Sequence, residues 1–250
     1  MALWKQGELL TGGLRPSRFK YSAIAVGRAV LGDKKTIQIN GVSADFIAPE
    51  IHNSLDFVPN SEQRMLERFV NSISSDTVVW DVGGELGIYS CLSGQAGAEY
   101  VHAFEPRSNV GEKLRLHMVI NGIRGSLHSV AFGEYDESMT KWLENNAPHA
   151  RMTDADSFAK THSNPDVVKV DIEGGEIGFL RGFERTLDET PPQRLFIELH
   201  PKGSHSQTNV GLSTKEIDEV HNRLVDAGYE TEEIGQRDGQ RLLDATRTDQ

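Results

Sequence analysis

Acidic side chains, a lysine and a histidine follow two apolar runs in the second half of the chain, and their types suit acid–base chemistry. In DVVKVDIEGGE, strand alternation places Lys169, Asp171 and Glu173 on one side. The run LFIELH places Glu198 and His200 at the equivalent height of a neighbouring strand. A carboxylate or an imidazole there can accept the proton of a hydroxyl, and an ammonium group can orient a carboxylate or stabilise an alkoxide. We therefore predict that these five residues form a catalytic site.

The residue types alone do not identify the base. Asp171 and Glu173 are favoured, because two acids at the end of a buried strand are costly unless they are used. Lys169 could instead pair with an acid, His200 could be a polar residue just past a strand, and Glu176 suits the start of a helix. A divalent metal is conceivable beside so many oxygen atoms, but such acids more often pair with Lys, Arg or backbone N–H groups. We expect no metal and little effect of a chelator.

A glycine-rich turn in VVWDVGGELGIYS marks a second candidate site. Glycine in an ordered segment costs about 0.5–1 kcal/mol against alanine, so three glycines within five residues imply a demand that only glycine meets. The turn lacks the dinucleotide fingerprint G-x-G-x-x-G and instead has the spacing D-x-G-x-x-x-G, formed by Asp81, Gly83 and Gly87. Glu85 beside this turn is a poor host for a pyrophosphate and a reasonable host for a cationic ligand.

An acidic residue also ends the next predicted strand. Glu105 in AFEP lies about 24 residues after Asp81. Folds with a glycine-rich first turn place an acid at about this distance, where it binds ribose hydroxyls. The two signals together predict a nucleoside-containing ligand.

The elements that must position these residues alternate between strands and helices. Such alternation predicts a parallel, twisted sheet with ligands at the carboxyl ends of its strands. After a helix over 213–229, Asp238-Gly239 joins two short strands and predicts an antiparallel hairpin that closes the sheet. The alternating strands are predicted at 77–82, 100–106, 127–133, 166–175 and 193–200, and the helices between them at 88–96, 109–121 and 176–187.

Two further elements precede this region. Asn40-Gly41 lies between two alternating runs and predicts a β-hairpin. The run SEQRMLERFVNSI spaces its apolar residues on one helical face and predicts a helix that begins at Ser61. We therefore divide the chain into an N-terminal extension with a β-hairpin, residues 1–59, and a domain over residues 60–250 that carries the predicted site.

Composition narrows the partners and the compartment. The 250 residues carry a formal net charge of −11 and show no basic stripe, which argues against a nucleic-acid partner. Apolar runs are too short for a membrane span, and the N-terminus lacks the continuous apolar core of a secretory signal. A single cysteine, Cys91, is compatible with a reducing compartment. We expect a cytoplasmic protein without a membrane partner.

Several segments, taken in order, resemble one known family. VVWDVGGELGIYS, VHAFEP, HMVING and DVVKVDIEGGEIGFLRGF, followed by LFIELH, are similar to the FkbM-type S-adenosylmethionine-dependent methyltransferases. The resemblance covers roughly residues 60–245, and KVDIEGGE is its most specific part. It implies a Rossmann-like class I methyltransferase fold with a mostly parallel seven-stranded sheet. It also implies S-adenosyl-L-methionine as cofactor, and most often O-methylation of a hydroxyl on a small or medium-sized molecule.

The resemblance also assigns cofactor contacts by position. The glycine turn would surround the methionine part, the acid after the second strand would bind the ribose, and the strand that follows would flank the adenine. Members usually have alanine-asparagine where this chain has Gly84-Glu85, and asparagine is common where it has His117. The implied cofactor-binding residues are Asp81, Gly83, Gly84, Glu85, Gly87, Glu105, Pro106, Val130 and Ala131.

Two alternative functions are consistent with parts of the pattern. A non-catalytic S-adenosylmethionine-binding module remains possible because of the Gly84-Glu85 departure. An NAD(P)-dependent oxidoreductase would need the dinucleotide fingerprint, whose spacing is missing at the glycine turn. A small-molecule acceptor is expected, while its identity and the oligomeric state cannot be read from the sequence, because specificity resides in variable loops.

Overall fold

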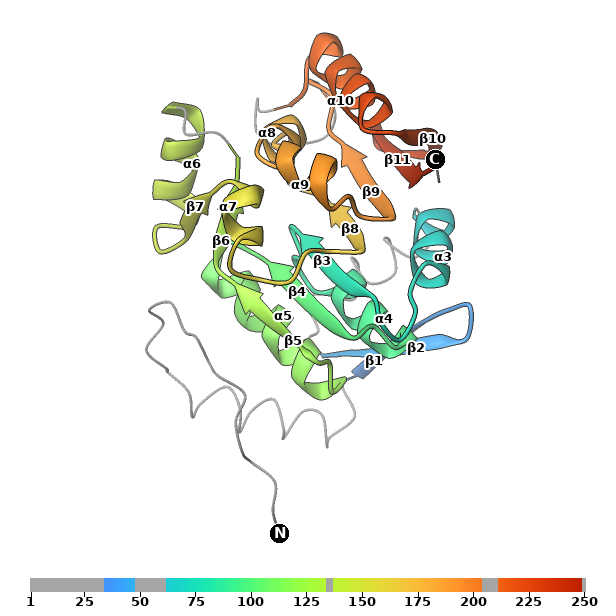
Figure 1. The fold of residues 1–250 in the computed structure, drawn as a ribbon. Helices are drawn as coiled ribbons and strands as arrows, with labels where there is room; N and C mark the ends of the chain where they lie inside the picture. Colours follow the sequence, from blue (N-terminus) through green and yellow to red (C-terminus); the bar gives the residue numbers. More distant parts are fainter. Residues whose placement is uncertain (1–33, 48–61, 134–136, 204–210, 249–250) are drawn as a thin grey trace.

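The computed structural model describes residues 34–47, 62–133, 137–203 and 211–248, and it is built around one twisted sheet (Figure 1). Five of the strands are parallel, and the last two form an antiparallel hairpin at one end. This confirms the predicted α/β class and mostly parallel seven-stranded sheet. The strands in spatial order are β10 (Tyr229–Arg237), β11 (Gln240–Arg247), β9 (Arg194–Leu199), β8 (Val167–Val170), β3 (Val78–Val82), β4 (Tyr100–Phe104) and β5 (Gly125–His128).

The order of the strands fixes the place of a ligand site. From β3 the chain first builds outward through β4 to β5, and then returns to pair β8 with the other edge of β3. In open α/β sheets, ligands bind in the crevice at the carboxyl ends of the strands, where the strand order reverses. The crevice here lies over the ends of β3 and β8.

Helices cover both faces of this sheet (Figure 1). Successive residues of β3 point to opposite faces, so Val79 packs in one apolar core and Trp80 in the other. The first core takes residues from α3 (Gln63–Asn71), α4 (Ile88–Ala96) and α5 (Ser108–Ile120). The second core takes residues from α7 (Ala155–Ala159), α8 (Glu176–Arg181), α9 (Glu184–Glu189) and α10 (Thr214–Asp226).

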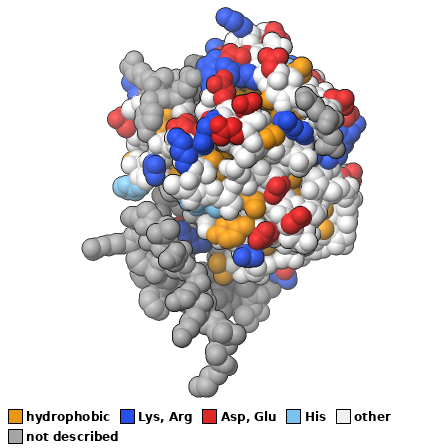
Figure 2. Space-filling view, in the orientation of Figure 1, with side chains coloured by type: hydrophobic (Ala, Val, Ile, Leu, Met, Phe, Trp, Pro, Cys, Tyr) orange, Lys and Arg blue, Asp and Glu red, His pale blue; other side chains and the backbone are white. Residues whose placement is uncertain are grey.

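Figure 2 shows acidic and basic side chains interspersed on the face that it presents. Ion pairs join some of the helices of the second core. Arg181 on α8 lies 2.8 Å from Glu219 on α10, and Arg223 on α10 lies 3.0 Å from the same carboxylate. No helix of the described part of the chain combines the length and apolar character that crossing a membrane requires.

The predicted N-terminal hairpin is present and packs on the first core. β1 (Lys34–Ile39) and β2 (Val42–Ile47) pair antiparallel around Asn40 and Gly41, whose φ angles are +49° and +83°. Two positive φ angles are what a type I′ turn requires. Phe46 of β2 is fully buried in the same core as α4 and α5. The hairpin is thus continuous with the hydrophobic core of the sheet.

His117 fixes that hairpin to the glycine turn. The imidazole Nδ1 of this α5 residue lies 2.7 Å from the Leu86 carbonyl, and its Nε2 lies 3.2 Å from the Ile47 amide nitrogen. With Nδ1–H donating, Nε2 accepts from Ile47. The histidine that stands at a common asparagine position therefore has a structural role.

Some predicted elements differ from the structure. The strand predicted at 127–133 leaves the sheet after β5, and its second part, β6 (Val130–Phe132), pairs with β7 (Arg151–Thr153) in a separate two-stranded sheet. Between β6 and β7 lies α6 (Glu137–Asn146), in a stretch that the sequence analysis assigned to no helix. The run LHSVAFG is compatible with one strand, so it does not reveal the change of pairing partner after His128.

The helix predicted over 176–187 is also two helices. α8 ends at Gly182, where an added Cβ would lie 3.0 Å from the Cβ of Asp154, and Phe183 then turns into the core. This close approach to α7 interrupts the helix. At the other end of the chain, α3 begins at Gln63 after Glu62, and Ser61 lies outside the described residues.

Two histidine side chains, one buried and one half-buried, lie side by side on neighbouring strands. His102 on β4 and His128 on β5 lie with Nδ1 and Nε2 3.0 Å apart, and His162 lies close to both rings. Burial, together with the other imidazoles, lowers the pKa of His102 to about 3 and that of His128 to about 4. Histidine in an unfolded chain titrates near pH 6.5.

We expect stability to fall as the pH falls from about 6.5 toward 4, since the unfolded chain binds protons there that the folded chain excludes. Thermal melts between pH 7.5 and 4.5 measure this. His128→Gln should show a smaller loss of Tm over that range, whereas the exposed His149→Gln should behave like the wild type. Equal pH dependence in all three proteins would contradict the assignment.

Candidate active site

A cavity of about 300 Å³ opens at the carboxyl ends of the central strands. It unites the two sites that the sequence analysis placed on separate motifs. One part of its wall comes from the loops after β3 and β4 and from β6, and the other comes from the loop after β8 and from the residue after β9. Its lining includes Gly83, Glu85, Glu105, Pro106, Arg107, Val130, Ala131, Trp142, Asp171, Glu173, His200 and Arg237.

The glycines after β3 serve two different contacts. Gly83 has a φ of +83°, and an added Cβ would lie 1.8 Å from the carbonyl oxygen of Asp171, so the loops after β3 and β8 touch at this point. Gly84 and Gly87 face α5 instead, where an added Cβ would lie 2.6 Å and 3.1 Å from the Leu114 side chain. Only Gly83 of the three is among the residues that line the cavity.

Asp81 lies beneath the cavity and holds the start of α4. Its Oδ2 accepts hydrogen bonds from the Ser90 amide at 2.9 Å and from the Ser90 hydroxyl at 2.5 Å. Burial raises the pKa of Asp81 to about 6, against the hydrogen bonds from Ser90 and the charge of Lys169. These contacts connect the end of β3 to the first turn of α4 and so shape the loop between them.

Glu85 lies exposed in that loop with a φ of +43°. Asparagine adopts this left-handed region more readily than glutamate, which accounts for the asparagine common in the family that the sequence resembles. The cavity walls limit the access of bulk water to this carboxyl group, and this desolvation, followed by the charge of Asp171, raises the pKa of Glu85 against the opposing charge of Arg107. Glu105 and Glu173 act in the same direction. This part of the cavity therefore favours positively charged groups.

Glu105 is almost fully buried at the end of β4. Its Oε1 accepts from the Arg107 amide at 2.9 Å and from Arg107 Nε at 2.8 Å, and its Oε2 accepts from Arg107 Nη2 at 3.1 Å. This bidentate pair raises the pKa of Arg107, against its partial burial. The carboxylate is held in a fixed orientation on the cavity wall.

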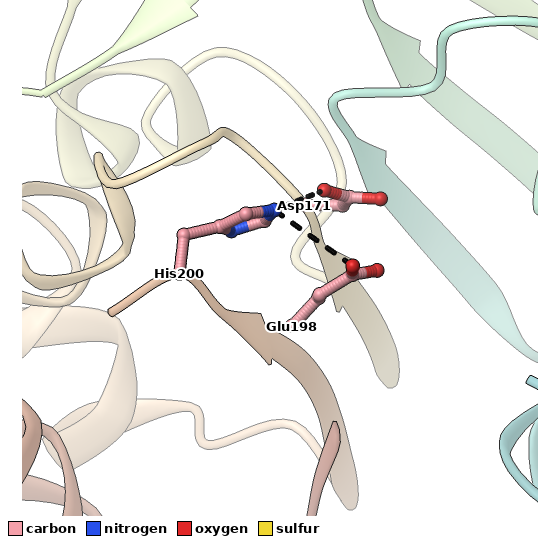
Figure 3. Close-up of side chains that lie close together, drawn as sticks. All are labelled: Asp171, Glu198 and His200. Carbon is pink, nitrogen blue, oxygen red and sulfur yellow. Dashed lines mark ion pairs between the residues drawn. The ribbon is translucent and has the colours of Figure 1, made fainter. Parts of the chain in front are cut away.

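Three of the predicted catalytic residues come together at the ends of β8 and β9 (Figure 3). His200 Nε2 lies 3.6 Å from Asp171 Oδ1 and 3.7 Å from Glu198 Oε1. Glu198 and His200 are buried, while the Asp171 side chain is 30% exposed toward the cavity. We call these three residues the Asp171–Glu198–His200 cluster.

Glu176 orients the imidazole of this cluster. Its Oε1 lies 2.8 Å from His200 Nδ1 and also accepts from the Gly174 amide at 3.0 Å. Burial alone would lower the pKa of His200, but the hydrogen bond to Glu176 and the nearby carboxylates raise it to about 9. Burial and the Asp171 carboxylate raise the pKa of Glu198 to about 8. Near neutral pH, Glu198 and His200 therefore both hold a proton, and these protons offset part of the negative charge at this site.

Lys169 lies fully buried behind the cluster. Its Nζ is 3.6 Å from Asp171 Oδ2 and 3.9 Å from Glu198 Oε2, and it lies 4.9 Å from the centre of the Tyr89 ring. Against the effect of burial, the charge of Lys169 lowers the pKa of Asp171. The predicted proximity of Lys169 to both acids is thus found, with the ammonium group below the acids and away from the cavity wall.

Sequence reasoning missed two charged residues that complete this network. Arg237, at the end of β10, donates to Glu198 Oε1 at 2.6 Å and also pairs with Glu62, which precedes α3. Tyr89 on α4 donates its hydroxyl proton to Glu62 Oε2 at 2.6 Å. No motif marks Arg237 or Glu62 as part of this site, because the two residues lie far apart in the sequence.

Glu173 does not join the cluster. β8 ends at Val170, so strand alternation does not continue to position 173, and Glu173 adopts a φ of +50° in the following turn. Its side chain is exposed at the cavity. The expected alignment of Lys169, Asp171 and Glu173 along one strand face is therefore wrong for Glu173, because the strand is shorter than predicted.

Comparisons with known proteins agree with this architecture. The model of the methyltransferase FkbM domain matches residues 148–231. The hexuronic acid methyltransferase AglP of Haloferax volcanii is 24% identical over 196 residues, which cover 71% of this chain and 79% of that protein. The structure of a SAM-dependent methyltransferase from Agrobacterium tumefaciens aligns with a TM-score of 0.52 and 12% identity, over 86% of this chain and 70% of that one.

Proposed function

We propose that this chain is an FkbM-type, S-adenosylmethionine-dependent methyltransferase that methylates a hydroxyl oxygen of a small or medium-sized acceptor in the cytoplasm. The observation that carries this proposal is the single cavity that connects the glycine turn with Asp171 and His200. Cofactor and acceptor must meet in one space, because the methyl group passes directly between them.

The cofactor would occupy the part of the cavity formed by the loops after β3 and β4. Its ammonium and sulfonium groups suit the negative potential around Glu85, and its ribose hydroxyls would bind the Glu105 carboxylate. Pro106, Val130 and Ala131 would supply an apolar lining for the adenine. Asp81, Gly84 and Gly87 would support this site indirectly, through α4 and α5.

The acceptor would lie between the cofactor and the Asp171–Glu198–His200 cluster. In the reaction, the acceptor hydroxyl gives its proton to a base, its oxygen bonds to the methyl carbon, and the S–CH₃ bond breaks with its electron pair left on sulfur. Asp171, Glu173 and His200 are the candidate bases on the cavity wall, and His200 acts as one only after it has lost the proton that its pKa of about 9 retains. Lys169 and Glu198 would hold Asp171 and His200 in place through their charges.

The similarity to a hexuronic acid methyltransferase suggests the first acceptors to test. The purified chain would be incubated with S-adenosylmethionine and with hexuronic acids, their glycosides and the matching neutral hexoses. Mass spectrometry detects the methylated product and S-adenosylhomocysteine. A hexuronic acid offers hydroxyl and carboxyl oxygens, and mild alkali separates them because it cleaves a methyl ester and leaves a methyl ether intact.

An alkali-stable methyl group, formed with one equivalent of S-adenosylhomocysteine, is the expected result. An alkali-labile product would move the acceptor atom to a carboxylate. Tight binding of S-adenosylmethionine without transfer to any hydroxyl acceptor, including diverse phenols and alcohols, would favour the non-catalytic alternative.

Cofactor binding gives a direct test of Glu85. We expect Glu85→Gln to weaken binding of S-adenosylhomocysteine by roughly tenfold, since a hydrogen bond to a charged group contributes about 1.5–3 kcal/mol and exposure reduces it. Titration calorimetry measures the affinity, and NAD should not bind in the same assay. Glu99→Gln is the matched control, because Glu99 is exposed just before β4, at the opposite end of that strand from the cavity. Equal affinity in both variants would show that Glu85 does not contact the ligand.

A further inference from the structure

We propose that Asp171, Glu198 and His200 bind one divalent transition-metal cation, which holds the acceptor oxygen beside the cofactor. The role of the ion toward the acceptor rests on the proposed function, whereas its binding to the three side chains does not. In the sequence, acids at the ends of strands favoured ion pairs with Lys or Arg over a metal site. The tertiary structure adds three observations: the spacing of the ligand atoms, the orientation of His200 and the surplus of negative charge.

The spacing of the three side chains fits one small ion. Each offers one ligand atom, and these atoms all lie within 4.8 Å of one another. Nε2 of His200 is 3.6 Å from an Asp171 oxygen and 3.7 Å from a Glu198 oxygen. Ligands about 2.1 Å from a tetrahedral ion are about 3.4 Å apart. Small side-chain movements therefore bring the three atoms to coordination distance.

The orientation of His200 is the one that a metal ligand adopts. Glu176 Oε1 lies 2.8 Å from Nδ1, so the N–H on that nitrogen donates to a carboxylate, and Nε2 faces Asp171 and Glu198. The Nε2 lone pair becomes available to an ion that displaces the proton held there. Metal-bound histidines usually donate their other ring N–H to such a partner. Glu176 itself is fully buried, which keeps this arrangement rigid.

Glu198 supplies an independent observation. Its side chain is fully buried, yet its Oε2 has no hydrogen-bond partner among the described residues. A buried carboxylate oxygen without a hydrogen bond costs free energy. Oε1 already accepts from Arg237, whereas Oε2 has only the Lys169 ammonium group at 3.9 Å, so Oε2 is the atom with unused coordinating capacity.

The charges of the described residues around the cluster leave a surplus that matches one divalent ion. An ion binds His200 and Glu198 only after both have released their protons, and four carboxylates then face two fixed cations, so two negative charges remain. A divalent cation neutralises this surplus, whereas a buried uncompensated charge is strongly unfavourable. The carboxylates are Glu62, Asp171, Glu176 and Glu198, and the cations are Lys169 and Arg237.

The ion would have an open position toward the cavity. Asp171 and His200 both line the cavity, so the remaining coordination position faces the space proposed for the acceptor. Three protein ligands with one open position are typical of catalytic metal sites. The acceptor oxygen would take this position, and its proton would pass to the carboxylate of Glu173, which lines the same cavity and is not a ligand. Nitrogen and oxygen ligands of this kind suit Zn²⁺ or Mn²⁺.

The test is a Zn²⁺ titration by calorimetry on the full chain, stripped with EDTA and free of any affinity tag, without cofactor or acceptor. We expect one saturable site per chain. Asp171→Asn and Glu198→Gln should each weaken Zn²⁺ binding by about 100-fold or more, and Glu176→Gln by about 10–100-fold through the orientation of His200. Glu99→Gln should bind like the wild type. Co²⁺ in place of Zn²⁺ should give intense visible absorption bands, which report a four-coordinate site with nitrogen and oxygen ligands.

A wild-type chain without a saturable Zn²⁺ site would overturn the inference, and this result does not depend on whether any variant folds. Unchanged affinity in Asp171→Asn and Glu198→Gln would also overturn it, because the ion would then bind elsewhere. Full methyl transfer by the EDTA-stripped chain would reject the catalytic role of the ion and leave the proposed function standing. Zn²⁺ binding in a chain that transfers no methyl group would reject the function and leave the ion site standing.

Discussion

Asp171→Asn and His200→Ala are expected to lower kcat for methyl transfer by about 10²–10⁴-fold, with a much smaller change in the affinity for S-adenosylhomocysteine. Both side chains line the cavity beyond the cofactor loops and lie 3.6 Å from each other. Whether they take the acceptor proton or hold an ion that polarises the acceptor oxygen, they act on the nucleophile. In the proposed site, other loops make the cofactor contacts.

Single-turnover methyl transfer, with cofactor affinity measured alongside, separates these effects. Asp171→Asn is the sharper variant because asparagine keeps the shape of the side chain. His200→Gln accompanies His200→Ala, since alanine leaves a buried hole and removes the partner of Glu176. His149→Gln, at an exposed position, controls for histidine loss. Full turnover in the Asp171 and His200 variants would mean that proximity alone drives the reaction.

Gly83→Ala is expected to lower the free energy of unfolding by about 2–5 kcal/mol and to weaken S-adenosylhomocysteine binding. A left-handed φ costs an alanine about 1–2 kcal/mol, and overpacking adds about 1–3 kcal/mol. The overpacking arises because the added Cβ would lie 1.8 Å from the Asp171 carbonyl oxygen, which is backbone and cannot rotate away. The loops after β3 and β8 would have to separate, and the cavity lies between them.

Gly41→Ala is the matched control for this variant. Gly41 has the same φ of +83°, but an added Cβ there meets nothing within 4 Å. It should therefore show the backbone cost alone, about 1–2 kcal/mol, and no loss of cofactor affinity. Urea denaturation and calorimetry measure both quantities. A Gly83→Ala variant no less stable than Gly41→Ala would show that the loops separate without cost.

The elements with strong local signals were predictable from the sequence. The helix predicted at 88–96 matches α4 residue for residue, because the glycine turn fixes its start and Gly97 its end. Both hairpins follow from Asn40-Gly41 and Asp238-Gly239, whose positive φ angles their turns require. The approach of Asp171 to Glu198 and His200 also followed, because the carboxyl ends of adjacent parallel strands meet at one edge of a sheet.

Elements that depend on contacts between distant segments were not predictable. The run 127–133 is compatible with one continuous strand, and only the pairing with β7 shows that its second part leaves the sheet. The run 176–187 has a helical pattern throughout, and only the close approach of Asp154 to Gly182 divides it. In both cases the local pattern fits more than one structure, and a neighbour from another part of the chain selects between them.

The sequence by itself determined the fold class, the resemblance to the FkbM-type enzymes and the acids that follow the strands, because periodicity and glycine spacing are local properties. The tertiary structure decided the chemistry of the site. It placed Glu173 outside the cluster and oriented His200 through its hydrogen bond with Glu176. It also brought Arg237 and Glu62, from opposite ends of the domain, into the same buried network. Charge and orientation act through space over a few ångströms, so side chains far apart in sequence set the properties of this site only once the chain has folded.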